Sequence, residues 1–200
     1  MRRQTDRQTD RQTDRQTDRQ TIIHRRRLNE VAICRRGSAM TEKTAVAGDI
    51  PVVANGPVPT YSHNAANRNG EMVVIARSGA YAGLVSYWNR PVFLTDAFSV
   101  HPDTGTLNTR YAFHFLQNSQ KHLHASKKGA GVPHVRVREI ENLIIPIPPL
   151  HEQERIVEIL DKFESLTNDL SIGLPAELAA RRKQYEYYRD RLLTFKELHP

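Results

Sequence analysis

The segment from Arg77 to Gly83 has the residue types of a turn that contacts a ligand. It reads Arg-Ser-Gly-Ala-Tyr-Ala-Gly, so two glycines and three small residues surround one arginine and one tyrosine. Glycine allows the backbone to approach a ligand closely, and an arginine held in such a turn can donate hydrogen bonds to a phosphate or to the edge of a base. Arg77 could instead form an internal salt bridge with Asp96, and the sequence leaves both roles open.

Histidine and cysteine side chains could supply metal or nucleophilic chemistry, but their spacing argues against both. His114, His122 and His124 are the candidate metal cluster. On a predicted helix, however, His122 and His124 point in different directions, so solvated helix histidines are the simpler interpretation. Cys34 has no base pattern beside it, and we interpret it as a small core residue. As the single cysteine, it also excludes an internal disulfide framework.

The motifs of the common nucleic-acid enzymes are missing from the sequence. It contains no glycine-rich phosphate loop ending in Lys-Ser or Lys-Thr, which an ATP-driven motor would need. No Asp or Glu stands two positions before a lysine, as in the simplest metal-dependent nuclease pattern, and there is no Asn-Pro-Pro-aromatic segment typical of a methyltransferase. We therefore predict a chain with no catalytic residues, no cofactor and no metal.

The candidate turn needs a rigid sheet behind it, and the middle of the chain has the pattern for one. Apolar and β-branched runs bounded by turn residues predict short strands at residues 28–33, 50–54, 71–76, 84–88, 92–94 and 96–100. The run at 71–76 gives the clearest prediction because it is β-branched and too short for a helix. Pro51 suits an edge or irregular strand, and residues 61–70 are expected to form a loop.

Helical spacing follows this strand-rich region. Apolar residues at helical intervals predict an amphipathic helix over residues 109–124, with Asn108 at its cap. A glycine-rich basic loop then occupies residues 127–134. Residues 143–150 are apolar but contain three prolines, which stop both a helix and a central strand, so we expect this segment to be a hinge.

Two helices are expected after the hinge. Residues 151–170 have apolar positions at intervals of three and four, and Pro175 suits the first position of a second helix. In that second helix Leu178, Tyr185, Tyr188, Leu192 and Phe195 follow a heptad-like pattern. The helix could dock on its own domain or form a coiled coil with a helix of another chain, and the pattern favours the coiled coil.

Length and charge set the broad class. The 200 residues suit one domain, or one domain with an added helical element, and the longest apolar run, 72–76, is far below the roughly 18 residues of a membrane span. The basic N-terminus lacks the apolar stretch of a secretory signal, so we expect a cytoplasmic protein. The net charge is +7, but residues 1–36 hold 11 arginines against five acidic residues, which leaves the rest nearly neutral.

The N-terminal tail is a repeat without apolar residues. Arg-Gln-Thr-Asp occurs four times from Arg3 to Asp18, and a fifth copy breaks off after Thr21. Such a tail is expected to be disordered, and its arginines could bind phosphates weakly. A DNA tract of tandem AGAC units encodes these four residues, in the same cyclic order, in every reading frame. Gain or loss of one four-base unit shifts everything downstream out of frame. We therefore interpret the tail as the product of a slippage-prone tract that switches the gene on and off, that is, phase variation.

Several segments together resemble the specificity subunit of type I restriction-modification enzymes. They are residues 75–79, 84–88, 129–134 and 174–189, and above all 143–157, which read Leu-Ile-Ile-Pro-Ile-Pro-Pro-Leu-His-Glu-Gln-Glu-Arg-Ile-Val. The resemblance covers about residues 28–197. It implies an α+β fold in which a strand-rich target recognition domain, which reads half of a split DNA sequence, is followed by a long helical spacer. We expect a tail at 1–27, the recognition domain at 28–148 and the helical region at 149–200.

The resemblance also implies partners and binding residues. The partners are double-stranded DNA and the methyltransferase and restriction subunits. A usual subunit carries two recognition domains, so this chain either forms a homodimer that reads an inverted repeat or is half of a gene split by a frameshift. The contact with a second copy or a second half-subunit is expected through residues 151–197. Base readout needs donors and acceptors on loops, with cations for phosphates. The loops offer Asn55, Tyr61, Asn64, Arg77, Tyr81, Lys127, Lys128, His134 and Arg136.

An alternative of a different class is an inactive or non-DNA interaction module that oligomerises through its C-terminal helices. The nearly neutral charge of residues 37–200 favours it. The two hypotheses differ in one measurable property, because only the DNA-binding subunit binds duplex DNA in a salt-sensitive manner once residues 1–27 are removed.

Overall fold

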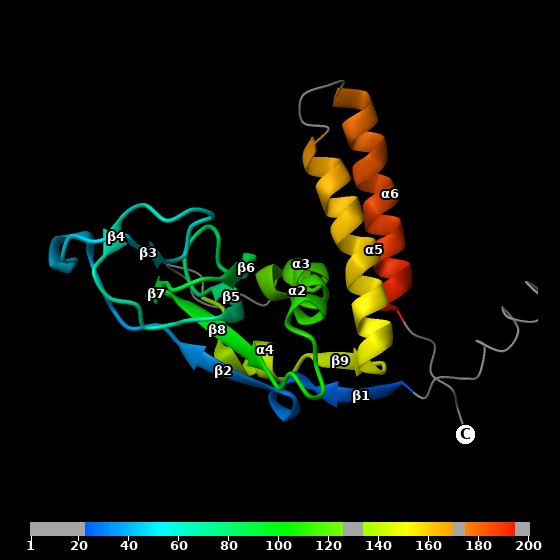
Figure 1. Ribbon diagram of the computed structural model, residues 1–200, viewed down its shortest axis with the longest axis horizontal. Helices are drawn as coiled ribbons and strands as arrows, with labels where there is room; N and C mark the ends of the chain where they lie inside the picture. Colours follow the sequence, from blue (N-terminus) through cyan, green and yellow to red (C-terminus); the bar gives the residue numbers. More distant parts are fainter. Residues whose placement is uncertain (1–22, 126–133, 170–174, 195–200) are drawn as a thin grey trace, which may run out of the picture.

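The computed structural model describes residues 23–125, 134–169 and 175–194. It combines a strand-rich unit with a pair of long helices at one end of the molecule (Figure 1). The strands and helices of the α+β fold therefore occur in the expected order. Within the described residues, no helix is long and apolar enough to cross a membrane.

A four-stranded antiparallel sheet forms the centre of the strand-rich unit. Its order is β2-β8-β5-β6, with β2 at Ala32–Arg36, β8 at Ala97–Pro102, β5 at Glu71–Ala76 and β6 at Val85–Asn89. The predicted strand at 71–76 is confirmed without any shift. The first predicted strand is displaced, because residues Leu28–Glu30 form a 3-10 helix, η1.

The two faces of this sheet bury different clusters. Val73, Ile75, Phe98 and Val100 pack against α2 (Thr109–Asn118) in the main core. The alternate residues Met72, Val74 and Ala97 enter a second cluster on the other face. Because β5 is covered on both faces, its five residues after Glu71 are all buried.

A smaller sheet covers the face of the four-stranded sheet that buries the second cluster. Its order is β4-β3-β7, with β3 at Ile50–Val53, β4 at Ser62–His63 and β7 at Phe93–Leu94. The first half of β3 pairs antiparallel with β4, and its second half pairs parallel with β7. Pro51 is tolerated because each half of the strand pairs on one side only, so the prediction of an irregular strand is confirmed. A short 3-10 helix, η2 (Glu42–Thr44), precedes β3.

The boundary expected at residue 28 was placed too late. Residues His24–Arg27 form strand β1, which pairs antiparallel with β9 at Ile144–Ile147. No sequence pattern predicted β1, because all four of its residues are polar and show no alternation of apolar and polar positions. It pairs because β9 offers a free edge, while Ile145 and Ile147 of β9 are buried. Residues 1–22 lie outside the described residues.

The proline-rich segment also differs from the prediction. Residues 144–147 are a strand and not a hinge, although Pro146 lies within it, opposite Arg25. A ribbon of two strands has no central strand, so the missing N–H of proline removes no bond that the ribbon requires. The carbonyl oxygen of Pro146 accepts a hydrogen bond of 3.1 Å from the buried Tyr111 hydroxyl.

The predicted helix at 109–124 is divided into α2 and α3 (Gln120–Ala125). Asn108 caps α2 as expected, and its side chain accepts from the backbone N–H groups of Arg110 and Tyr111. At the junction the Ser119 hydroxyl donates to the carbonyl oxygen of Phe115, a bond that competes with helix continuation. A short helix, α4 (Val137–Glu141), precedes β9.

The two long helices, α5 (Leu150–Asp169) and α6 (Pro175–Leu193), lie side by side (Figure 1). The prediction that Pro175 begins the second helix is confirmed. Phe163 and Tyr188 stack with ring centroids 5.4 Å apart, and Leu193 enters the main core. The second helix therefore docks on its own chain, while Leu166 and Tyr187 remain exposed by 48% and 58%.

Cys34 packs against the main core, as the sequence suggested. Burial, and secondarily the charge of Glu141, raises the pKa of the thiol from 9.0 to about 12. Because the thiolate is the reactive form, alkylation of the native chain by iodoacetamide at pH about 8 is expected to be about a thousandfold slower than in urea. Mass spectrometry of timed samples measures this rate, and equal rates would contradict the burial of the thiol.

Candidate nucleic-acid interface

The candidate turn is the loop between β5 and β6, and its own backbone holds it closed. The N–H of Gly83 donates to the carbonyl oxygen of Ala76 at 2.8 Å, and the N–H of Ala82 donates to that of Gly79 at 3.1 Å. Gly79 and Gly83 have φ angles of 77° and 89°, which other residues adopt only with strain. Tyr81 lies between them and is 53% exposed. The loop therefore presents an aromatic ring on a fixed backbone.

Arg77 forms the internal salt bridge that the sequence left open. Its Nε donates to Oδ1 of Asp96 at 2.6 Å, and the Ser78 hydroxyl binds the other carboxylate oxygen. Both charged side chains are about a quarter exposed. Arg77 also lines a pocket of about 350 Å³ together with Arg36. Since Asp96 neutralises its charge, Arg77 is better suited to hold the loop than to bind a phosphate by charge alone.

Two other predicted residues meet this loop. The Asn55 side chain faces Gly79, where a Cβ atom would lie 3.3 Å from its Nδ2. His134 forms a β-bridge with Ser78, and the N–H of the next residue, Val135, donates to the carbonyl oxygen of Arg77. Polar groups from three distant parts of the chain thus converge on the β5–β6 loop.

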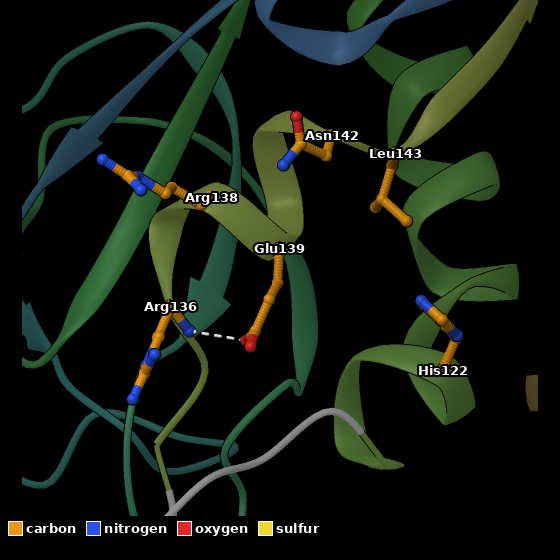
Figure 2. Close-up of a pocket in the computed structure, with 6 residues that line it drawn as sticks. All are labelled: His122, Arg136, Arg138, Glu139, Asn142 and Leu143. Carbon is orange, nitrogen blue, oxygen red and sulfur yellow. Dashed lines mark hydrogen bonds between the residues drawn. The ribbon is translucent and has the colours of Figure 1, made fainter.

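Arg136 lies at the start of α4, beside a second pocket (Figure 2). The pocket has a volume of about 370 Å³ and is lined by His122, Arg136, Arg138, Glu139, Asn142 and Leu143. The backbone N–H of Arg136 donates to Oε2 of Glu139, and the residue itself is exposed. His122 and Arg138 were not among the predicted binding residues. Only the tertiary structure brings His122 of α3 to the same pocket as the residues of α4.

Lys127 and Lys128 lie outside the described residues. The described residues on either side of them lie against the β5–β6 loop. A Cβ atom on Gly83 would come within 3.1 Å of the backbone nitrogen of His124, and His134 bridges to Ser78. The chain therefore leaves and rejoins the described structure beside the same loop.

Tyr61 and Asn64 are less directly connected to this interface. The Tyr61 hydroxyl donates to the carbonyl oxygen of Met40 at 3.3 Å, and burial followed by the charge of Glu42 raises the pKa of that hydroxyl. Met40 lines the pocket beside Arg77, so Tyr61 reaches the interface through one intervening residue. Asn64 is exposed, and its backbone packs against Gly48.

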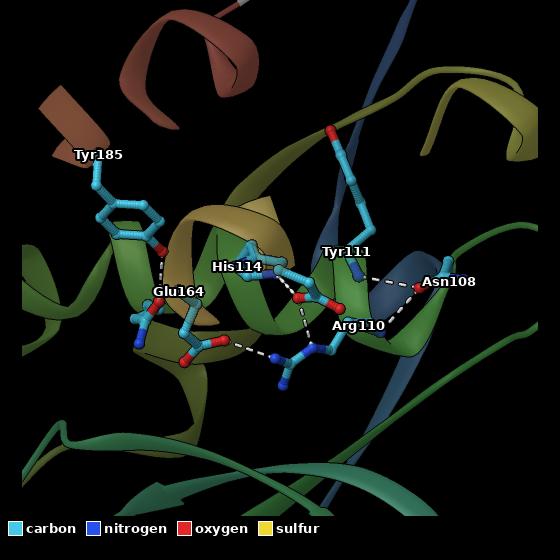
Figure 3. A network of polar contacts seen from close by, with 8 residues as sticks. Asn108, Arg110, Tyr111, His114, Glu164 and Tyr185 are labelled. Carbon is cyan, nitrogen blue, oxygen red and sulfur yellow. Dashed lines mark hydrogen bonds and ion pairs between the residues drawn. The ribbon is translucent and has the colours of Figure 1, made fainter. Parts of the chain in front are cut away.

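A polar network joins α2 to the long helices (Figure 3). Arg110 donates to Asp161 at 2.9 Å and to Glu164 at 2.6 Å, and its guanidinium lies 4.8 Å from the ring centroid of Tyr87. His114 Nε2 lies 2.7 Å from Oδ1 of Asp161. His114, Asp161 and Glu164 have a spacing that could suit a metal ion. Because Arg110 already places its positive charge on both carboxylates, the geometry favours an ion-pair network that fixes the helices.

The buried His114 predicts a loss of stability in acid. Burial lowers its pKa below the ordinary value of 6.5, against the opposing effect of Asp161. Nδ1 has no hydrogen-bond partner among the described residues, so a proton added there would have no acceptor. The unfolded chain therefore binds the proton first, so stability is full above pH 6.5 and falls as the pH drops through the lowered pKa. Urea unfolding between pH about 7.5 and 5 should show this fall. His114→Asn should flatten it, and an unchanged slope would contradict the assignment.

Comparison with known proteins identifies the family. Residues 24–180 match the type I restriction modification DNA specificity domain, and the chain belongs to this family. A candidate type I restriction enzyme specificity subunit of Haemophilus influenzae is 30% identical over 181 residues, 82% of this chain and 46% of that protein. A type I restriction enzyme specificity subunit of Escherichia coli is 46% identical over 88 residues, 43% of this chain and 22% of that protein.

Solved structures share the fold. The S subunit of a type I restriction-modification system from M. genitalium superposes with a TM-score of 0.66 at 16% identity, over 77% of this chain and 42% of that one. The HsdS subunit from Thermoanaerobacter tengcongensis gives a TM-score of 0.59 at 22% identity, over 86% and 44%. The resemblance and the fold class predicted from the sequence are thereby confirmed. The chain spans between a fifth and about half of these relatives.

Proposed function

We propose that this chain binds duplex DNA sequence-specifically, as one recognition half of a type I specificity subunit, and directs methyltransferase and restriction subunits to a bipartite site. The observation that carries this proposal is the convergence of Asn55 and His134 on the closed β5–β6 loop that presents Tyr81. Arg136 follows Val135, which is hydrogen-bonded to Arg77 of this loop, and lines a pocket together with Arg138. Side chains on a fixed loop can read base edges, and nearby arginines can bind phosphates. Membership of the specificity family supports this function.

A bipartite site needs two recognition halves, and we infer that the second half binds beside the helix pair of this chain. The helix pair offers the contact surface, because Leu166, Tyr187 and Tyr188 are exposed at 48%, 58% and 38%. A second copy of the chain would give a site with inverted half-sequences, whereas a different half-subunit would give two unrelated halves. In both cases the helices set the distance between the two half-sites.

Methylome sequencing of the host with the gene intact and with it deleted tests the proposed function. We expect one bipartite motif, methylated on adenine, to disappear from the deletion strain. The symmetry of that motif distinguishes a homodimer from a pair of different half-subunits. An unchanged methylome, with the protein shown to be expressed, would contradict the proposal.

A double substitution of Lys127 and Lys128 by alanine tests the loop between α3 and α4. If these lysines bind phosphates, duplex binding should weaken by about tenfold or more. The slope of log affinity against log salt concentration should also fall by nearly the contribution of two phosphate contacts. The control is Lys162→Gln, which removes a positive charge from the exposed side of α5. Equal affinities of the double variant and the control would exclude the lysines from the DNA contact.

The second candidate is a non-DNA module that oligomerises through α5 and α6, favoured by the exposed Leu166 and Tyr187. It predicts no salt-sensitive duplex binding by a chain that begins at residue 23.

The slippage hypothesis for residues 3–21 is tested separately, by sequencing the gene from single colonies. We expect AGAC units that vary in number, and a tract of mixed synonymous codons would contradict it.

A further inference from the structure

A second group of basic side chains lies on the face of the four-stranded sheet opposite α2. Phe98 and Val100 of β8 point into the core with α2, so the alternate residues Ser99 and His101 point to the other face. Arg35 lies next to Ser99 across the β2–β8 pair and is exposed. Arg68 lies in the connection between β4 and β5, and its side chain donates a hydrogen bond to the Ser99 hydroxyl.

The hydroxyl of the fully buried Ser99 lies at the centre of this group. It lies 2.8 Å from Nε of Arg68, 2.9 Å from Nε2 of His101 and 3.3 Å from the carbonyl oxygen of Arg35. A serine hydroxyl has one proton, and the Arg35 carbonyl oxygen can only accept it. Arg68 therefore donates to Ser99, whereas the direction of the bond between Ser99 and Nε2 of His101 depends on the tautomer of the imidazole.

The guanidinium of Arg68 is held firmly but is not neutralised. Its Nη1 and Nη2 donate to the carbonyl oxygens of Asn67 and Arg36, each at 2.7 Å. Its backbone is also bound to Val92, through bonds of 3.1 and 3.0 Å. All of these acceptors are uncharged. An arginine has five N–H groups, and three of those of Arg68 are used here, which leaves two without an acceptor among the described residues.

Arg35 and Arg68, the two positive groups, and the neighbouring His101 have no acidic partner in the part of the chain that the structure describes. No carboxylate there forms an ion pair with Arg35, Arg68 or His101. Burial and then the charge of Arg35 lower the pKa of Arg68, while burial followed by Arg35 and Arg68 lowers the pKa of His101. The like charges of Arg35 and Arg68 repel each other, and an anion that binds both of them removes this repulsion.

The group lies one residue along β2 from the pocket beside Arg77. Arg36 lines that pocket, and its carbonyl oxygen accepts the hydrogen bond from Nη2 of Arg68. We propose that Arg35, Arg68 and His101 bind a phosphodiester group of the DNA backbone, outside the part of the duplex that the β5–β6 loop reads. This inference rests on the DNA-binding function proposed above. The contact fixes the position of the duplex and carries no base preference.

The test compares Arg35→Gln with Arg35→Lys in the full chain assembled with its partner subunits. Arg35 is exposed, and its side chain makes no contact that the fold needs, so both variants should fold. Fluorescence anisotropy with a labelled duplex, from about 50 to about 200 mM salt, gives the affinity and its salt dependence. Arg35→Gln should bind about three- to tenfold more weakly, with a salt slope smaller by about 0.9, and Arg35→Lys should keep the wild-type slope. Lys162→Gln serves as the remote charge control.

The loss must be equal for target and non-target duplexes, because a phosphate contact does not distinguish sequences. A loss confined to the target sequence would overturn the inference in favour of base readout. Equal binding by Arg35→Gln and Arg35→Lys would also overturn it. If Arg35→Gln abolished the stabilisation of the protein by inorganic phosphate but left duplex binding unchanged, the site would bind a free anion and not DNA. If it impaired only assembly with the other subunits, the group would face an acidic protein surface. Failure of the proposed function itself appears differently, as wild-type protein without sequence preference.

Discussion

Replacing Gln153 with leucine is expected to lower the free energy of unfolding by about 3 to 5 kcal/mol. Gln153 is fully buried in the first turn of α5, within the segment that carries the family resemblance. Its Oε1 accepts from the N–H of Asn108 at 2.8 Å, and its Nε2 donates to the carbonyl oxygens of Thr106 and Pro148. Leucine has a similar size but leaves all three backbone groups, which are buried or partly buried, without their side-chain partner.

These three bonds join the loop before α2, the end of β9 and the start of α5. We therefore expect Gln153→Leu to loosen the contact between the helix pair and the strand-rich unit, in addition to lowering the free energy of unfolding of the protein. Urea unfolding followed by circular dichroism measures the change. The matched control is Glu154→Gln, at the exposed neighbouring position, which should change stability by less than about 0.5 kcal/mol. A similarly small change in Gln153→Leu would show that Gln153 does not anchor the helix.

Gly37→Ala is expected to destabilise the protein by about 3 kcal/mol, near the upper end of the usual cost of overpacking. Gly37 follows β2, where its N–H donates to the carbonyl oxygen of Ala97 and the next N–H donates to that of Leu94. A Cβ atom at Gly37 would overlap the carbonyl oxygen of Thr95 and lie 2.7 Å from that of Leu94. Both atoms belong to backbone, so neither can rotate away.

Gly56→Ala is the matched control for this substitution. The nearest atom to a Cβ at Gly56 is the carbonyl oxygen of Val58 at 3.7 Å, which is an ordinary contact. Thermal unfolding of the two variants under the same conditions should therefore show a large loss for Gly37→Ala and almost none for Gly56→Ala. Because Gly37 also lines the pocket beside Arg77, the first variant should weaken DNA binding too. Equal melting temperatures would show that the backbone at Gly37 yields easily.

Local patterns in the sequence predicted much of the fold. A continuous β-branched run placed β5, Asn108 placed the start of α2, and Pro175 placed the start of α6. In each case the residues that determine the element lie within it or beside it. The same local signals failed at β1, because strand pairing there depends on β9, more than a hundred residues later in the chain, and not on any periodicity of its own.

The candidate site divides in the same way. The sequence by itself determined the family motif, the glycine-rich turn at 77–83 and the two long helices, since these depend on near neighbours in the chain. Only the tertiary structure decided between the two roles of Arg77, and only it brought Arg68 to Ser99, 31 positions away, and Arg110 to Asp161, 51 positions away. Hydrogen bonds and ion pairs between such distant residues leave no regular spacing in the sequence, because the packing of the sheet and helices alone determines which side chains meet.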